Sequence, residues 1–267
     1  AERRSLGETK TIAEMARQSQ QSGRTPIGGM VVNVDLRLGS DRAHLTELLK
    51  AHQEIAGESM KGIRFAGAHD ADPDNLVIAL QADPDLYRQP GFQKGVQLLG
   101  ELGLTYDTWH YHHQMGDFIQ LAQSVPDTTL ILDHFGTPLG TGRFQSQRDA
   151  IFQQWKKDIT TLARCQNVVL KLGGLAMPDN GFGWHEQEAP ADASQLLREQ
   201  GKYYQHAIEC FGPERCMFES NFPVDRLSIS YRSLWNAYKR LVADFSESDK
   251  HALFYGTAAR VYQLKPA

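Results

Sequence analysis

Cysteine is scarce in this sequence of 267 residues, which contains only Cys165, Cys210 and Cys216. No two of them form a CxxC pair, so the sequence offers neither a disulfide framework nor a cysteine-rich zinc site. This scarcity favours a protein of the reducing cytoplasm.

Long apolar runs, a signal peptide and basic clusters are also missing. No apolar run approaches the roughly 18 residues that span a bilayer, and the opening ten residues are too polar for a signal peptide. The formal charge is −4, with no polybasic run that could follow a phosphate backbone. We therefore expect a soluble protein that binds a small molecule and neither nucleic acid nor membrane, while no feature of the sequence fixes an oligomeric state.

Three common motifs are absent as well. The sequence has no GxGxxG after a predicted strand, no GxxxxGK[ST] and no GxSxG. These absences remove the simplest arguments for dinucleotide binding, for nucleotide binding and for a serine hydrolase.

What the sequence does contain is a regular alternation of two kinds of segment. Short apolar runs rich in β-branched residues predict six strands, at residues 30–36, 62–66, 106–111, 129–133, 168–172 and 216–219. Amphipathic segments predict helices at residues 8–22, 43–56, 91–102, 116–124, 147–163, 192–211, 230–244 and 247–262. This order is typical of a parallel sheet with crossover helices, so we expect an α/β fold that forms a single domain over residues 1–267.

Long polar connections follow two of the predicted strands, at residues 68–90 and 173–190. Long loops at the carboxyl ends of strands are where α/β barrels carry their active sites. In the second loop, Trp184, His185 and Glu186 are either part of a lid or ordinary surface residues.

The densest group of reactive side chains is the run Trp109-His110-Tyr111-His112-His113-Gln114 at the end of a predicted strand. Strand alternation places His110 and His112 on one face and Trp109, Tyr111 and His113 on the other. Histidine can ligate a metal or transfer protons near neutral pH. We expect Trp109 and His110 to contact substrate and His112 to act in catalysis; the alternative is that some of these rings make hydrogen bonds in the core or face solvent.

Two further strand ends carry polar side chains. The strand that ends in Leu132 is followed by Asp133-His134 and a turn with Gly and Pro, and the last strand is followed by Glu219-Ser220-Asn221-Phe222-Pro223-Val224-Asp225. His134 either faces the same cavity as the histidine run or caps a loop. Asn221 could position a water or a carbonyl and Asp225 could act as a base, or Asn221 is a turn residue and Asp225 a helix cap.

Three cations lie near these strand ends. Arg64 sits inside a predicted strand between apolar residues, where it either binds a substrate carboxylate or pairs with an acid of the barrel. Lys171, inside the predicted strand VVLKL, either lines the barrel or pairs with a neighbouring carboxylate. Arg143, in a glycine-rich loop, is a weaker candidate for binding a carboxylate.

Four motifs taken together resemble the amidohydrolase-related family that contains sugar-acid and dicarboxylate lactonases. They are KGIR at 61–64, LDHFGTP at 132–138, FGPERCMFESNFPVD at 211–225 and FYGTAARVYQL at 254–264, and their order and spacing agree over nearly the whole chain. The resemblance implies a (β/α)8 TIM barrel with its site at the carboxyl ends of the strands. It also implies histidines from the fifth and sixth strands and an acid from the eighth, which correspond to His112 or His113, His134 and the region of Asn221.

The sequence departs from this family in two places. Members generally carry an HxH pair on the first strand, but no HxH precedes Trp109 and too few residues precede Met30 for two strands. Because a barrel does not close with six strands, we expect the native gene to encode a further N-terminal segment. Asn221 stands where many relatives have Asp, and an amide takes no proton at neutral pH. The cofactor is therefore either one divalent metal, such as zinc on His112, His113 and His134, or none.

The motifs predict a hydrolase that opens a lactone or related cyclic ester of a small sugar acid or carboxylated substrate. In this hypothesis His134 and His112 polarise the carbonyl or orient water, Asp225 or a water on Asn221 supplies the base, and Arg64 and Arg143 bind the substrate carboxylate. Two alternatives stay open at this point: a decarboxylase of a small aromatic or dienoic acid, and a catalytically inactive barrel that serves as a binding or scaffold protein.

Overall fold

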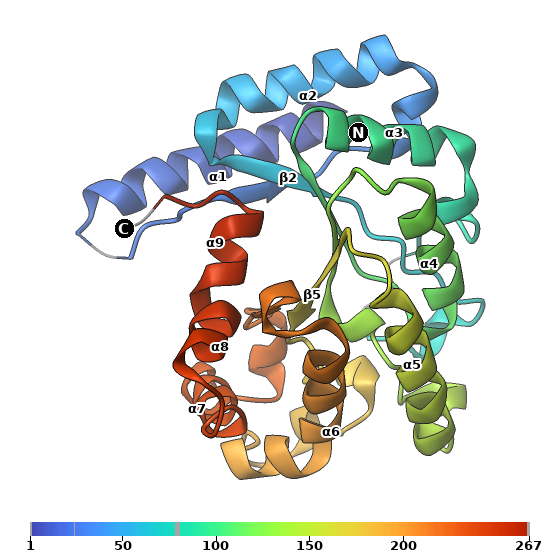
Figure 1. Ribbon diagram of the computed structural model, residues 1–267, viewed down its shortest axis with the longest axis vertical. Helices are drawn as coiled ribbons and strands as arrows, with labels where there is room; N and C mark the ends of the chain where they lie inside the picture. Colours follow the sequence, from blue (N-terminus) through green and yellow to red (C-terminus); the bar gives the residue numbers. More distant parts are fainter. Residues whose placement is uncertain (1, 24, 78–80, 266–267) are drawn as a thin grey trace.

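The computed structural model describes residues 2–23, 25–77 and 81–265. Its centre is one parallel sheet in which each strand pairs with the next along the chain (Figure 1). The strands are β1 (Met30–Val32), β2 (Met60–Arg64), β3 (Thr105–Thr108), β4 (Leu130–Leu132), β5 (Val168–Leu172) and β6 (Cys216–Phe218). The six predicted strands and the α/β class are thus confirmed, with the strand order of a TIM barrel.

Most helices cover the outside of the sheet, while α9 packs against its inner face (Figure 1). They are α1 (Glu2–Gln21), α2 (Arg42–Ala56), α3 (Pro90–Glu101), α4 (Met115–Ser124), α5 (Arg148–Leu162), α6 (Ala193–Phe211), α7 (Tyr231–Leu241), α8 (Glu247–His251) and α9 (Thr257–Val261). None of the helices in these described ranges is long and apolar enough to cross a membrane.

The helix starts follow from short polar side chains. Asp41, Asp192, Ser230 and Ser246 each precede a helix and accept a hydrogen bond from the backbone N–H three residues later. Such caps satisfy N–H groups that have no partner inside the helix. Because Ser230 caps α7, the alternative in which Asp225 caps this helix is wrong.

Two predicted segments differ from the observed ones. The first strand ends at Val32 and not at Leu36, because Asp35 accepts a hydrogen bond from the N–H of Arg37 and begins a 3-10 turn. The segment 247–262 is helical from residue 247 to residue 261, as predicted, but it contains a π turn from Ala252 to Gly256 between α8 and α9.

The two faces of the sheet differ in chemistry. The side chains that face the helices are apolar and buried, among them Leu130, Leu132, Leu170, Leu172 and Phe218. On the inner face an apolar layer of Ile131, Val169 and Met217 packs against α9. The next inward positions toward the carboxyl ends are charged: Arg64, Asp107, Asp133, Lys171 and Glu219. Strand alternation therefore gathers the charged groups at the end of the sheet where the loops lie.

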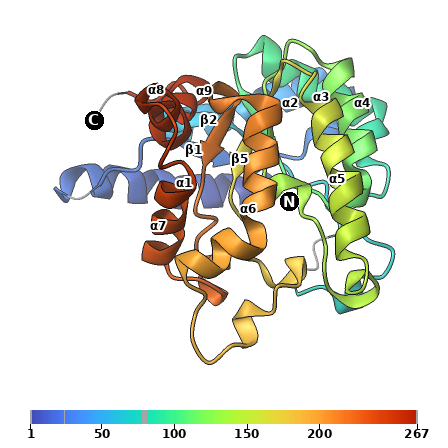
Figure 2. The same cartoon turned by 60° about the horizontal axis from the view of Figure 1, so that its bottom comes forward.

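The loop between β5 and α6 projects beyond that end of the sheet (Figure 2). Trp184 lies within it but is buried, and its indole N–H donates to Glu199 of α6 at 2.9 Å. The residues predicted as either a lid or surface are thus anchored at Trp184 to a helix, while Glu186 is exposed. Residues 78–80 of the other long connection lie outside the described residues.

Candidate active site

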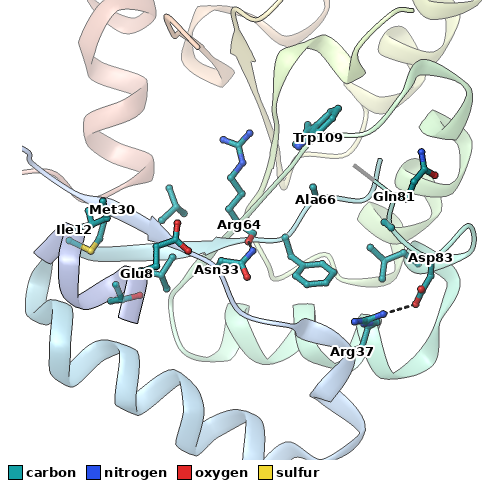
Figure 3. A pocket seen from close by; sticks show the side chains of 16 residues that line it. Glu8, Ile12, Met30, Asn33, Arg37, Arg64, Ala66, Gln81, Asp83 and Trp109 are labelled. Atoms are coloured by element: carbon teal, nitrogen blue, oxygen red, sulfur yellow. Dashed lines mark hydrogen bonds and ion pairs between the residues drawn. The ribbon is translucent and has the colours of Figure 1, made fainter. Parts of the chain in front are cut away.

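A cavity of about 450 Å³ opens between α1, β1 and the loop that follows β2 (Figure 3). Arg64 and Trp109 form its inner wall, and Asn33 and Gln81 contribute amide groups. The remaining polar side chains of the wall are Glu8, Thr9, Arg37 and Asp83. Helix α1 is held beside this cavity by a hydrogen bond of 2.8 Å between Thr9 and His52 of α2.

His134 lies next to this wall between an acid and a cation. Its Nδ1 is 2.6 Å from Oε1 of Glu219, and its Nε2 is 3.2 Å from Nη2 of Arg64. A neutral imidazole in this setting donates from Nδ1 to the carboxylate and accepts at Nε2 from the guanidinium. The arrangement leaves Nε2 as the basic nitrogen, directed toward Arg64.

Glu219 was not among the residues predicted to act in the site. Burial by itself would raise the pKa of Glu219, but His134, the hydrogen bond between them and the cations Lys171 and Arg64 lower it to about 2. The carboxylate is therefore ionised at neutral pH. The sequence signal was available, because alternation along β6 places Glu219 on the same face as Met217 and one position beyond the strand.

Arg64 joins this pair to a second group of charges. Its Nη1 lies 3.3 Å from Oδ2 of Asp133, which is fully buried. Lys171 lies 3.1 Å from the other oxygen of Asp133 and 2.7 Å from Asp107. Arg64 and Lys171 thus both form internal ion pairs with acids of the barrel. Arg64 also lines the cavity.

The loop after β6 holds Asn221 and Asp225 together. The Asn221 amide donates to Oδ1 of Asp225 at 2.8 Å, and Asn221 adopts a left-handed φ of 51°. Burial raises the pKa of Asp225 to about 7, against the opposing effects of the Asn221 hydrogen bond and of His134. Asp225 is thus a carboxyl group that can hold a proton near neutral pH.

Trp109 and His110, the first two residues of the histidine run, face opposite ways. Trp109 borders the cavity, with its ring centre 6.5 Å from that of His134. His110 lies in the core, with its ring centre 5.0 Å from Phe118 and Nδ1 3.1 Å from the Tyr87 hydroxyl. The structure therefore places His110 behind the cavity wall, fully buried, and not on the wall.

His112 and His113 belong to the loops above the sheet. Strand β3 ends at Thr108 and a 3-10 turn begins at His112, so the predicted alternation does not extend to these rings. Nδ1 of His112 accepts the N–H of Leu139 at 3.2 Å, and burial lowers the pKa of His112 to about 4. Nε2 of His113 lies 3.1 Å from the His69 carbonyl.

Arg143 forms an ion pair with an acid of another loop. Its two terminal nitrogens lie 2.7 Å from the two oxygens of Asp70, whose side chain is 1% exposed. Its guanidinium also stacks over Phe144 at 4.5 Å. The geometry is that of a bidentate ion pair between the loop after β2 and the loop after β4.

The predicted metal ligands do not come together as a metal site. Within residues 2–23, 25–77 and 81–265, no group of three or more His, Cys, Asp or Glu could hold a metal ion. Both nitrogens of His134 face protein partners, Glu219 and Arg64, and the carboxylate of Asp133 pairs with Arg64 and Lys171. The residues present therefore do not fit a divalent ion, and we derive no step through one.

Comparison with known proteins adds three likenesses. Residues 28–264 match the sequence profile of the family described as Amidohydrolase. The chain is 34% identical over 236 residues to the uncharacterized protein y4mH of Sinorhizobium fredii, covering 88% of this chain and 70% of that protein. It is 28% identical over 228 residues to the L-fucono-1,5-lactonase of Burkholderia multivorans, covering 85% of this chain and 71% of the lactonase.

A similar fold occurs in the crystal structure of an amidohydrolase from Burkholderia multivorans with bound HEPES. The TM-score is 0.75 at 26% identity, over 95% of this chain and 79% of that chain. Another crystal form of the Burkholderia multivorans amidohydrolase was solved with bound zinc and gives a TM-score of 0.73. The inner-face charges and the His134–Glu219 pair thus lie in a fold shared with an amidohydrolase.

Proposed function

Because the chain belongs to the amidohydrolase family and is a hydrolase, we propose that it opens the ring of a neutral, polyhydroxylated sugar lactone by adding water to the lactone carbonyl. The observation that carries this proposal is the line of groups Glu219–His134–Arg64, with 2.6 Å and 3.2 Å between neighbours, beside the cavity. Similarity to an L-fucono-1,5-lactonase supports the same class of substrate.

His134 is the proposed general base. Glu219 fixes the tautomer that leaves Nε2 without a proton, as the acid does in acid–histidine pairs of other hydrolases. A water that inserts between Nε2 and Arg64 gives its proton to Nε2 while its oxygen attacks the carbonyl carbon. The ring C–O bond then breaks, and the imidazolium returns the proton to the leaving alkoxide, which yields a hydroxy acid.

Arg64 and the loop after β6 stabilise the charges that form. The guanidinium lies beside Nε2, so it meets the negative charge on the carbonyl oxygen of the tetrahedral intermediate. Asn221 donates to Asp225 and keeps its own amide oxygen for a water or a substrate hydroxyl. In this scheme Asp225 holds Asn221, and His112, which lies in the loops above, is not required.

The cavity wall supports a neutral substrate over a carboxylated one. Of the two arginines in the wall, Arg37 pairs with Asp35 at 2.7 Å and with Asp83 at 3.0 Å, and Arg64 pairs with Asp133 at 3.3 Å. Arg143, which lies outside the wall, pairs with Asp70. Burying a substrate carboxylate requires a cation that is free to pair with it. The amides of the wall and the indole face of Trp109 instead match the hydroxyl groups and C–H faces of a sugar ring.

The test is a panel of lactones offered to the purified protein. We expect hydrolysis of L-fucono-1,5-lactone and related sugar lactones, and slower turnover of a dicarboxylate lactone, followed by the acid released. His134→Gln should lower kcat/KM by about 100-fold or more, as expected for loss of a general base.

The matched control is His206→Gln, since His206 lies on α6 and bonds to the Lys156 carbonyl at 3.0 Å, away from the cavity. This control should keep wild-type rates. A His134→Gln variant as active as the control would contradict the proposal, and so would release of carbon dioxide from an aromatic acid without turnover of any lactone.

A further inference from the structure

Lys171 is a cation on the inner face of the sheet that the proposed reaction does not use. Its side chain is 12% exposed, and its Nζ lies 2.7 Å from Asp107 and 3.1 Å from Asp133. Burial by itself would lower the pKa of Lys171, but the two carboxylates raise it well above its usual range. The amine therefore stays protonated and acts as a fixed positive charge.

The two carboxylates depend on Lys171 to different degrees. Asp107 also accepts hydrogen bonds from the hydroxyl of Thr105, at 3.0 Å, and from that of Tyr262. Asp133 is fully buried, and the part of the chain that the structure describes gives its carboxylate only two partners, the cations Lys171 and Arg64. Loss of Lys171 would thus leave Asp107 supported but Asp133 with Arg64 alone.

The ion pair between Arg64 and Asp133 is longer than an optimal one, so the two groups could move closer together. Their closest atoms are 3.3 Å apart, whereas charge-assisted hydrogen bonds between nitrogen and oxygen are about 2.7–2.9 Å long. The same guanidinium reaches His134 Nε2 through its other nitrogen, at 3.2 Å. A shift of Arg64 toward Asp133 would therefore be a shift away from His134.

We propose that Lys171 is a positioning residue: by sharing Asp133 with Arg64, it keeps the guanidinium of Arg64 against Nε2 of His134. Lys171 holds one oxygen of Asp133 and Arg64 the other, so the attraction of the carboxylate is divided between two cations. The effect on rate rests on the proposed function, whereas the effect on the position of Arg64 does not.

The experiment that needs no substrate is NMR of the imidazole nitrogens of His134 in the full chain. In Lys171→Met, the ¹⁵N resonance of Nε2 should shift from its wild-type position as Arg64 moves away, and Lys171→Arg should bring it back toward that position. The matched control is Lys61→Met on β2, because Lys61 donates to the Gln263 carbonyl at 3.2 Å and lies outside the network. Its spectrum should coincide with that of the wild type.

The kinetic arm uses L-fucono-1,5-lactone as the probe. Lys171→Met should lower kcat by about 10- to 100-fold with little change in KM, since a small displacement of a group at the reacting centre has effects of this size. Lys171→Arg should recover most of the loss. If the wild type hydrolyses no lactone, the proposed function fails while the NMR result still decides the role of Lys171.

A Lys171→Met protein that is folded and keeps the wild-type His134 resonances would overturn the proposal. Should this variant not fold because Asp133 is left with too little positive charge, Asp133→Asn combined with Lys171→Met removes both charges. With Asp133 neutral, Arg64 is no longer drawn away from His134, so the Nε2 resonance should stay close to its wild-type position. A displaced Nε2 resonance in the double variant would also overturn the proposal, because the displacement would then not arise from the charge of Asp133.

Discussion

Asp225→Asn should stabilise the protein, and more strongly as the pH rises. One carboxylate oxygen accepts from Asn221 at 2.8 Å, while the other has no hydrogen-bond partner among the described residues, and the residue is 1% exposed. Ionising such a group costs the folded state free energy that the unfolded state does not lose. An asparagine keeps an oxygen for the Asn221 amide and carries no charge.

The magnitude follows from the pKa of Asp225, which burial raises from 3.8 to about 7 in the folded protein. A raised carboxyl pKa costs no stability below about pH 4, and the cost grows as the pH rises until it is complete above about pH 7. Above pH 7 the ionisation of Asp225 destabilises the folded protein by ~4 kcal/mol, of which about 2 kcal/mol is already lost at pH 5.

Urea denaturation at pH 5 and pH 8 is the assay. The gain in unfolding free energy from Asp225→Asn should be about 3 kcal/mol larger at pH 8 than at pH 5. The control is Asp127→Asn, an exposed turn residue, for which no pH-dependent difference is expected. Equal gains from Asp225→Asn at both pH values would refute the reasoning, because Asp225 would then be ionised or protonated at both.

Two further predictions concern packing and charge. A methyl group on Gly39 would come within 2.2 Å of the backbone nitrogen of Gly95 in α3, so Gly39→Ala should cost about 2 kcal/mol or more in urea denaturation, whereas Gly116→Ala, with no atom within 4 Å, should be neutral or stabilising. Arg143→Ala should cost roughly 1–2 kcal/mol by leaving Asp70 buried without its bidentate partner, the exposure of Arg143 limiting the loss. It should change KM for a neutral sugar lactone less than about threefold; a KM that rises tenfold or more would place Arg143 on the substrate.

The order of strands and helices could be predicted because each element carries its own local signal. The run VVLKL predicts a strand at residues 168–172, and β5 has the same bounds, Val168–Leu172. Helix starts were within a few residues where Asp or Ser provides a cap, as at Asp192. The error in β1 arose because Leu36 continues an apolar pattern, while Asp35 ends the strand by capping a turn.

The candidate site could be predicted as a region but not as a set of contacts. His134, Arg64 and Trp109 were expected near the site and lie at or beside the cavity. A strand that runs to residue 111 predicts one face for His110 and His112, but β3 ends at Thr108 and a 3-10 turn begins at His112, so the alternation does not reach these rings. The turn is held within the run by Gln114 and Tyr111, and also by bonds to other loops, such as that of the His112 N–H to the Thr137 carbonyl at 3.3 Å, which one segment of sequence does not reveal.

Ion pairs between segments that are far apart in the sequence could not be predicted from the sequence alone. Arg143 and Asp70 are 73 positions apart, and both lie in loops whose meeting depends on the whole fold. His134 and Glu219 are 85 positions apart and meet because β4 and β6 flank β5 in one sheet. Which cation takes which acid was therefore open until the strands were placed.

The most direct test of the central claim is kcat/KM for a sugar lactone in His134→Gln, Glu219→Gln and the variant with both changes. Residues that act as one unit show effects that do not add. We expect each single change to lower kcat/KM strongly and the double variant to be no slower than His134→Gln alone. A double variant in which the two losses multiply would contradict the claim that Glu219 acts through His134.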